Sequence, residues 1–148
     1  MKTLIFKTQL LEAKKIQRDV EVPEDFSLYE LAGGILKAYE FDFDHAFGFF
    51  RKITSGWGGL AESESYELFA DLEVEAIEPT NAKSVKKTQV SEVWKNPKDK
   101  MMMLFDYGDE WRFIVTLKGF GEKQVRQKYP HLLTKTGEAP EQYPKIEE

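Results

Sequence analysis

A chain of 148 residues, 41% hydrophobic and 32% charged, has the size and composition of one folded domain with a single core. Its net charge of −5 leaves no overall basic field for sequence-independent nucleic-acid binding, and the absence of cysteine excludes disulfides, thiol nucleophiles and thiolate metal sites. No segment holds the roughly 20 consecutive apolar residues that span a bilayer, so we expect a cytoplasmic protein without a membrane partner.

The N-terminal residues 3–22 predict a β-hairpin. Leu4, Phe6 and Leu10 fall on one side of an extended chain, which is the pattern of a half-buried strand. A polar break is followed by a second alternating run, and Pro23 then removes the N–H group that further pairing would need.

The main helix is predicted to begin at DFSLYEL. Ser27 and Glu30 have the spacing of a capping box, in which each side chain accepts a hydrogen bond from a free backbone N–H group. An apolar stripe follows at helical spacing. It consists of Leu28, Leu31, Ala32, Ile35, Leu36 and Tyr39. Gly33 and Gly34 lie on the opposite side, where either a close backbone approach or tolerance on an exposed face would explain them.

The segment FDFDHAFGFFRKI, residues 41–53, predicts a turn that leads into an aromatic strand. A Gly- and Ser-rich stretch at 54–65 follows, and we expect it to be a mobile loop. Trp57 lies in this loop, where it either contacts a partner or packs back on the body of the domain.

The middle of the chain has weaker signals. Residues 66–77 predict a strand, although a short apolar run also fits a helix. Lys83, Lys86 and Lys87 form the most basic local cluster, which is typical of a solvated face. Thr88 is a candidate cap for a short second helix.

Residues 101–118 predict a second hairpin with a turn at Gly108. If its loop holds two residues, one face is the candidate core. That face carries Met102, Leu104, Asp106, Trp111, Phe113 and Val115. Beyond Gly119 the chain becomes polar, and we expect a short strand near Val125 and an acidic C-terminal tail that frays.

The turn of this hairpin, in LFDYGDEWRF, has a structural interpretation. Asp106 would accept hydrogen bonds from N–H groups of the turn or from the Trp111 indole. Gly108 would supply a positive φ angle, and Asp109 would face water. These residue types are sufficient for such a turn.

The same acids also have a functional interpretation. If Asp106 and Asp109 meet Asp42, Asp44 and His45 in space, they form an oxygen-rich site with one imidazole, which suits a hard divalent cation. The imidazole would then act as a ligand or general base, whereas a histidine at the start of a strand is more often structural. The sequence contains no glycine-rich phosphate loop, dinucleotide fingerprint, nucleophile elbow or zinc-helix motif, and we predict no cofactor.

Two segments, IQRDVEVPEDFSLYELAGGILKAYEFDFDHAFGF and MMMLFDYGDEWRFIVTL, resemble the plasmid pRiA ORF-3-like family, whose members also carry the name transposon-passenger TnpR-family protein. The most specific matches are FDFDHAFGF, which contains His45, and FDYGDEW, which contains Asp106, Asp109 and Trp111. The chain departs from the family at Phe113, where members commonly have histidine, and in its APEQYP ending. These departures remove groups that a catalytic mechanism would use.

The resemblance implies an α+β domain with an antiparallel or mixed β-sheet backed by helices, in a family without an established biochemical role. With the elements above, we predict a single domain over residues 1–148, with one main helix and a shorter second helix packed against the sheet. The association of the family with plasmids and transposons is a genomic context and does not define an activity.

We therefore predict a non-enzymatic binding or interaction domain, in a plasmid or mobile-element context, with a protein or small molecule as its partner. The first alternative is a metal-dependent hydrolase that uses the Asp/His cluster, and the second is a nucleic-acid-binding module that uses the lysine cluster beside exposed aromatic residues. The candidate surface consists of His45, Asp106, Asp109 and Trp111, with Asp42, Asp44, Trp57 and Gly108 as secondary candidates.

Overall fold

The computed structural model describes residues 1–71 and 82–144, and over these residues the chain forms one mixed β-sheet with a longer and a shorter α-helix. The strands are β1 (Lys2–Leu10), β2 (Ala13–Pro23), β3 (Phe47–Phe50), β4 (Ser65–Glu67), β5 (Lys83–Ser84), β6 (Lys100–Phe105), β7 (Trp111–Glu122) and β8 (His131–Thr136). The helices are α1 (Leu28–Ala38), α2 (Val90–Val93) and the 3-10 helix η1 (Leu68–Asp71). The predicted α+β class is confirmed.

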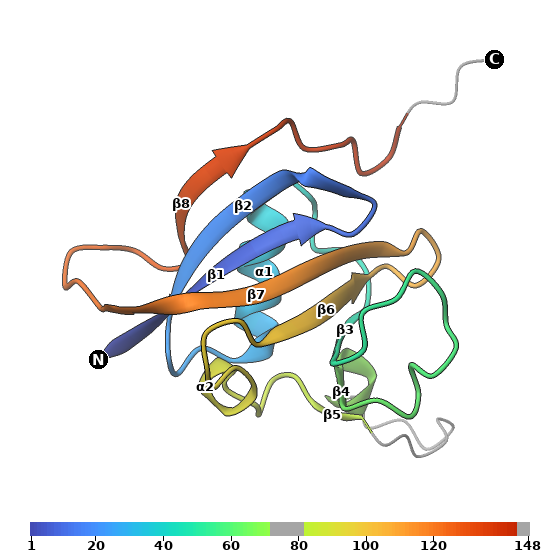
Figure 1. Ribbon diagram of the computed structural model, residues 1–148, viewed down its shortest axis with the longest axis horizontal. Helices are drawn as coiled ribbons and strands as arrows, with labels where there is room; N and C mark the ends of the chain where they lie inside the picture. The colour runs from blue at the N-terminus through green and yellow to red at the C-terminus, as the bar shows by residue number, and fades with distance from the viewer. Residues whose placement is uncertain (72–81, 145–148) are drawn as a thin grey trace.

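The sheet has the strand order β5-β4-β3-β6-β7-β1-β2-β8. All neighbouring strands are antiparallel except β4 and β5. Figure 1 shows that α1 lies against one face of the sheet, behind β1 and β7 in this view. None of the helices in the described ranges has the length and apolar character needed to cross a bilayer.

The predicted N-terminal hairpin is confirmed. β1 pairs with β2 from Thr3, opposite Pro23, to Leu10, opposite Ala13. Leu4, Phe6 and Leu10 are buried, as the alternation of the sequence requires. On its other side β1 pairs with β7, and β2 pairs with the edge strand β8, so both strands of this hairpin lie inside the sheet.

Helix α1 begins with the predicted capping box. The Glu30 N–H group donates to Ser27 Oγ at 3.1 Å, and the Ser27 N–H group donates to Glu30 Oε1 at 3.1 Å. The apolar stripe of the helix is buried against the sheet. Gly34 is also buried, and a Cβ atom at this position would lie 2.5 Å from Cγ of Pro130. A close approach therefore explains Gly34, which has no room for a side chain.

A second, smaller apolar cluster lies on the opposite face of the sheet. Phe50, Met102 and Leu104 are buried there together with Leu60, which comes from the segment that joins β3 to β4. This connecting segment, residues 51–64, therefore covers the sheet face that α1 leaves open. Its predicted mobility stays a prediction.

The predicted core face of the β6–β7 hairpin is confirmed for β7, where Trp111, Phe113 and Val115 face the main core, and is wrong for β6. Phe105 pairs with Trp111, so the connection holds the five residues 106–110 and not two. An odd number of loop residues shifts the register by one, and a shift of one exchanges the faces of one strand. Met103 and Phe105 consequently share the α1 side of the sheet with Phe113, whereas Met102 and Leu104 face the smaller cluster.

The cap of α2 also differs from the prediction. The helix follows Gln89, whose N–H group donates to the Glu92 carboxylate at 2.6 Å. The hydroxyl of Thr88 instead donates to the carbonyl oxygen of Ser84 at 2.6 Å. Thr88 therefore stabilises the turn before the helix, and Gln89 is the N-cap residue.

Two other sequence signals gave incomplete or wrong elements. The strand predicted at 66–77 is present only as β4, which ends at Glu67 and is followed by η1, and residues 72–77 lie outside the described residues. Val125 is fully exposed in a loop, and the last strand is β8 instead. The acidic end of the chain, 145–148, also lies outside the described residues, so its fraying stays a prediction.

Candidate functional site

The turn 106–110 between β6 and β7 is organised by the carboxylate of Asp106, a buried residue. Its Oδ1 atom accepts hydrogen bonds from the N–H groups of Gly108 at 3.1 Å and Asp109 at 3.2 Å. The structural role predicted for Asp106 is therefore present, through the backbone of the turn and not through the Trp111 indole. The positive φ angles belong to Asp106 and Glu110, at 61° and 57°, so the prediction that Gly108 has a positive φ is wrong.

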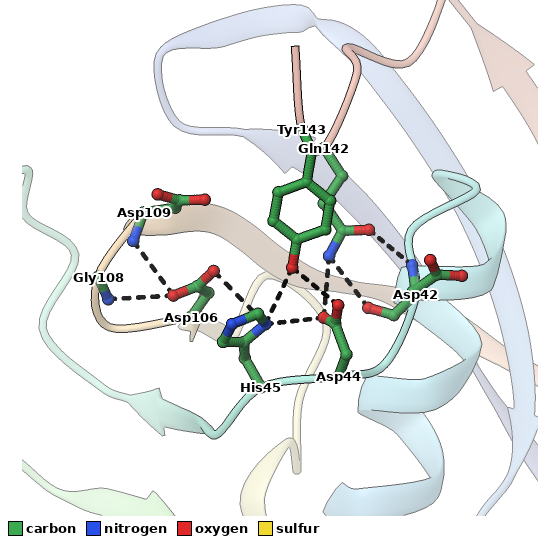
Figure 2. Close-up of polar contacts among 8 residues, drawn as sticks. All are labelled: Asp42, Asp44, His45, Asp106, Gly108, Asp109, Gln142 and Tyr143. Atoms are coloured by element: carbon green, nitrogen blue, oxygen red, sulfur yellow. Dashed lines mark hydrogen bonds and ion pairs between the residues drawn. The ribbon is translucent and has the colours of Figure 1, made fainter. Parts of the chain in front are cut away.

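The FDFDH and FDYGDEW segments meet in space, because β3 pairs with β6 and their ends lie together. The Asp106 N–H group donates to the carbonyl oxygen of Ala46 at 2.9 Å. Nδ1 of His45 lies 2.8 Å from Oδ1 of Asp44 and 3.6 Å from Oδ2 of Asp106. Figure 2 shows the imidazole between these two carboxylates.

A third segment completes this arrangement, and we call residues 140–143 the C-terminal strap. The side-chain amide of Gln142 accepts from the Asp42 N–H group at 2.7 Å and donates to the Asp42 carbonyl at 3.1 Å. The hydroxyl of Tyr143 donates to Oδ2 of Asp44 at 2.8 Å and lies 3.1 Å from Nδ1 of His45. Figure 2 shows the side chains of Gln142 and Tyr143 directed at the segment 42–45.

The electrostatics of the cluster follow from these contacts. The hydrogen bond to Asp44 and the nearby charge of Asp106 raise the pKa of His45 above its ordinary value of 6.5. Hydrogen bonds from Tyr143 and His45 lower the pKa of Asp44 below 3.8. Desolvation and the hydrogen bond to Asp44 raise the pKa of Tyr143 to about 12. Around neutral pH the Tyr143 hydroxyl is therefore a stable proton donor to an ionised carboxylate.

The structure brings together only some of the predicted site residues. Asp44 and Asp106 each contact His45, whereas Asp42 joins the cluster through its backbone. The carboxylate of Asp109 is exposed and points away from the imidazole (Figure 2).

The indole of Trp111 lies apart from this cluster. It packs edge-to-face on Phe41 with ring centroids 4.8 Å apart. Trp111 is therefore part of the packing at the edge of the main core.

Gln142 and Tyr143 are the contributors that sequence reasoning missed. They are 98 to 100 residues away in sequence from the residues they contact. A contact of this kind leaves no periodic pattern and no motif spacing. Nothing in the local sequence could have identified them.

Trp57 lies on the other side of the turn and is 50% exposed. Its ring meets Tyr107 edge-to-face at 6.0 Å, and the Arg112 guanidinium lies 5.4 Å from its centroid. Arg112 is buried and donates to the carbonyl oxygens of Thr54 at 2.7 Å and Gly56 at 3.0 Å. These two bonds hold the segment that carries Trp57 against the sheet.

Metal binding would require at least three suitable ligands around one point. Among residues 1–71 and 82–144, no three His, Asp or Glu side chains form such a group. His45 Nδ1 is directed at the carboxylates of Asp44 and Asp106, and Asp106 Oδ1 is occupied by backbone N–H groups. These contacts join the segment before β3, the turn 106–110 and the strap.

Comparison with other proteins gives a family and a fold. A family model described as "Plasmid pRiA4b ORF-3-like protein" matches residues 2–143. Among solved structures, the chain is similar to a protein of unknown function, MM3350 from Methanosarcina mazei Go1, with 19% sequence identity and a TM-score of 0.71. The match covers 94% of this chain and 71% of that chain, and it shows a shared fold. No curated protein matches the chain.

Proposed function

The chain belongs to the plasmid pRiA4b ORF-3-like family, and we propose that it is a non-enzymatic binding domain that recognises a protein partner. Its contact surface would be the turn surface, which we define as the turn 106–110 together with His45 and Trp57. The name of the family supports a plasmid or mobile-element setting for this partner. The rest of the proposal depends on the geometry of the surface.

The observation that carries the proposal is the fixed position of a half-exposed tryptophan. Trp57 is in contact with Tyr107 and Arg112, and Arg112 also bonds the backbone of its segment. A large side chain that is already ordered loses little conformational entropy on binding. Tryptophan is also among the residues most enriched at the energetic centres of protein interfaces.

The charges around Trp57 indicate what its partner presents. Asp109 and Glu110 are exposed on the turn, and Asp44 is exposed beside it. Complementary charge at the rim of an interface accelerates association and disfavours wrong partners. The partner we propose therefore carries an apolar pocket for Trp57, surrounded by basic residues.

The two alternatives receive less support from the structure. A metal-dependent hydrolase needs a convergent ligand group, which the described residues do not provide. A nucleic-acid interface would need free cationic groups, but Lys83 lies over the Tyr66 ring at 5.7 Å and Lys86 over the Tyr29 ring at 5.1 Å. The net charge of −5 also opposes binding to a polyanion.

The test is affinity capture from an extract of the native host, with wild type, Trp57→Ala and Leu133→Ala as immobilised proteins. Leu133 is the matched control, since it is another exposed apolar side chain, 40% exposed, on the edge strand β8. We expect a partner that wild type and Leu133→Ala retain equally. Trp57→Ala should bind it roughly 30-fold more weakly, because a central tryptophan contributes about 2 kcal/mol or more.

The readout is quantitative mass spectrometry of the retained proteins, followed by a direct binding titration with the purified partner. Circular dichroism of the three proteins shows whether each is folded. The same set of retained proteins for all three variants would contradict the proposal.

A further inference from the structure

A pocket of about 220 Å³ lies beside the turn surface, where the β1–β2 turn, the start of β7 and the strap meet. Its apolar lining consists of Leu10, Ala13, Ile16, Trp111 and Pro140. The volume is below the roughly 300–1,000 Å³ of pockets for drug-sized ligands. The pocket therefore fits a single side chain or a small amine, and it is too small for a nucleotide or an extended cofactor.

The charged residues of this pocket leave an excess of negative charge. Glu12 and Glu110 contribute two carboxylates to the lining, and Arg112 contributes one positive charge. The Arg112 guanidinium is already bonded to Glu110 at 2.8 Å and to two loop carbonyls. Glu12 is exposed and makes no ion pair with any residue in the described ranges. One negative charge at the mouth is thus uncompensated.

We propose that this pocket accepts a lysine or arginine side chain of the protein partner. The alkyl part of such a side chain would lie against Leu10, Ile16 and the Trp111 ring, while its charged end stays near Glu12. Long basic side chains commonly bury their methylene groups in this way and keep the charge near water.

This inference rests on the proposed function, because it identifies what the basic partner inserts next to the turn surface. The connection is physical, since Glu110 belongs both to the turn 106–110 and to the pocket lining. The pocket also uses Pro140, so the strap that holds His45 forms one of its walls.

The probes for the test are the methylamides of N-acetyl-lysine and N-acetyl-arginine, with that of N-acetyl-norleucine as the neutral control. Each is titrated into the full chain labelled with ¹⁵N, up to about 50 mM because ligands of this size bind weakly. The reporters are the indole N–H signal of Trp111 and the amide signals of Ala13 and Ile16. The indole signal of Trp94, which is fully buried in the core, serves as an internal reference.

We expect saturable shifts at the three reporters with the lysine and arginine probes, and weaker binding of norleucine. Glu12→Gln should weaken the lysine probe about two- to fivefold, which is the effect of one partly exposed ion pair. Glu24→Gln should change nothing, because Glu24 directly follows β2 at the end opposite the β1–β2 turn. Both glutamates are accessible at the surface, so neither change should disturb folding.

Two results would overturn the inference. Norleucine binding as tightly as lysine would show an apolar pocket without charge selection, and the absence of saturable shifts would show no pocket for either probe. Failure of the pocket and failure of the proposed function are separable. Probe binding without Trp57-dependent capture would refute the interaction surface alone, whereas Trp57-dependent capture without probe binding would refute the pocket alone.

Discussion

At the scale of single residues, His45 makes the stability of the protein depend on pH. A pKa that is raised in the folded state contributes stability that is complete below the unfolded value near 6.5 and is lost as the pH rises through the folded value. Asp44 has a lowered pKa, so its contribution is complete above 3.8 and is lost as the pH falls through its folded value. Both contributions are complete between these two values.

We therefore expect His45→Gln to lower the free energy of unfolding more at pH 5.5 than at pH 8.5, because only the protonated imidazole attracts Asp44 and Asp106. Urea unfolding of wild type and His45→Gln at the two pH values measures this difference. The second measurement is an NMR titration of the His45 ring in wild type and in Asp44→Asn. The pKa of His45 should fall towards 6.5 in Asp44→Asn, and an unchanged pKa would contradict the assigned cause.

Sequence reasoning identified part of this cluster from residue types alone. Asp106 was placed correctly in the turn because aspartate commonly bonds the backbone N–H groups that follow it. The left-handed conformation of Asp106 and Glu110 was not predictable. Glycine is the residue that most often adopts a positive φ angle, so the sequence favoured Gly108 for this role. The contacts of Tyr143 depend on the path of the whole chain.

At the scale of elements, the two adjacent glycines of α1 should respond in opposite ways to alanine. Alanine in place of glycine inside a helix is normally stabilising by about 1 kcal/mol. A Cβ atom at Gly33 would meet Cδ2 of Phe43 at 3.5 Å, which is an ordinary contact, so Gly33→Ala should be stabilising. A Cβ atom at Gly34 would overlap the Pro130 ring, so Gly34→Ala should be destabilising by about 1–3 kcal/mol.

Urea unfolding of the two variants measures both effects, and each serves as the control for the other. Equal stabilisation by both substitutions would show that α1 does not press on Pro130. Equal destabilisation would show that the helix tolerates no side chain at either position.

Helices and strands were predicted correctly where the residues that determine them lie close together in the sequence. The capping box and apolar stripe of α1 lie within one helix, and both were predicted correctly. The β6–β7 hairpin was predicted correctly, but the face of β6 was wrong, because it depends on the number of loop residues and the glycine of the turn favoured a two-residue loop. β8 has five of its six residues exposed, so it carries no alternation to detect.

At the scale of the whole molecule, thermal unfolding distinguishes a binding domain from a metal enzyme. A metal that binds only the native state raises the unfolding temperature with its concentration. The described residues offer no group of three ligands, so we expect equal unfolding temperatures with a chelator and with Mg²⁺, Ca²⁺, Mn²⁺ or Zn²⁺. Asp109→Asn should behave like wild type. Stabilisation that rises with one ion and disappears in Asp109→Asn would instead support the hydrolase.

The class of the fold was predictable from the sequence, whereas the order of its strands was not. Alternating and helical periods identify strands and helices one at a time. The pairing of β1 with β7 and of β2 with β8 joins segments from opposite ends of the chain. A local sequence pattern does not identify which strands will be neighbours. The position of the strap, and its contacts with the segment 42–45, could therefore not be predicted from the sequence either.

The central place of β1 also affects how the protein is made. Leu10 pairs with Phe113 and Lys2 with Glu122, so the partners are separated by 103 to 120 residues of chain. At about 5–20 residues per second, a ribosome delivers β7 roughly 5 to 20 seconds after β1. During this interval the β1–β2 hairpin has neither of its two neighbours, because β8 is synthesised after β7, and the edge that β7 will cover stays open to other strands. The nascent chain is therefore most vulnerable to mispairing before its last third is synthesised.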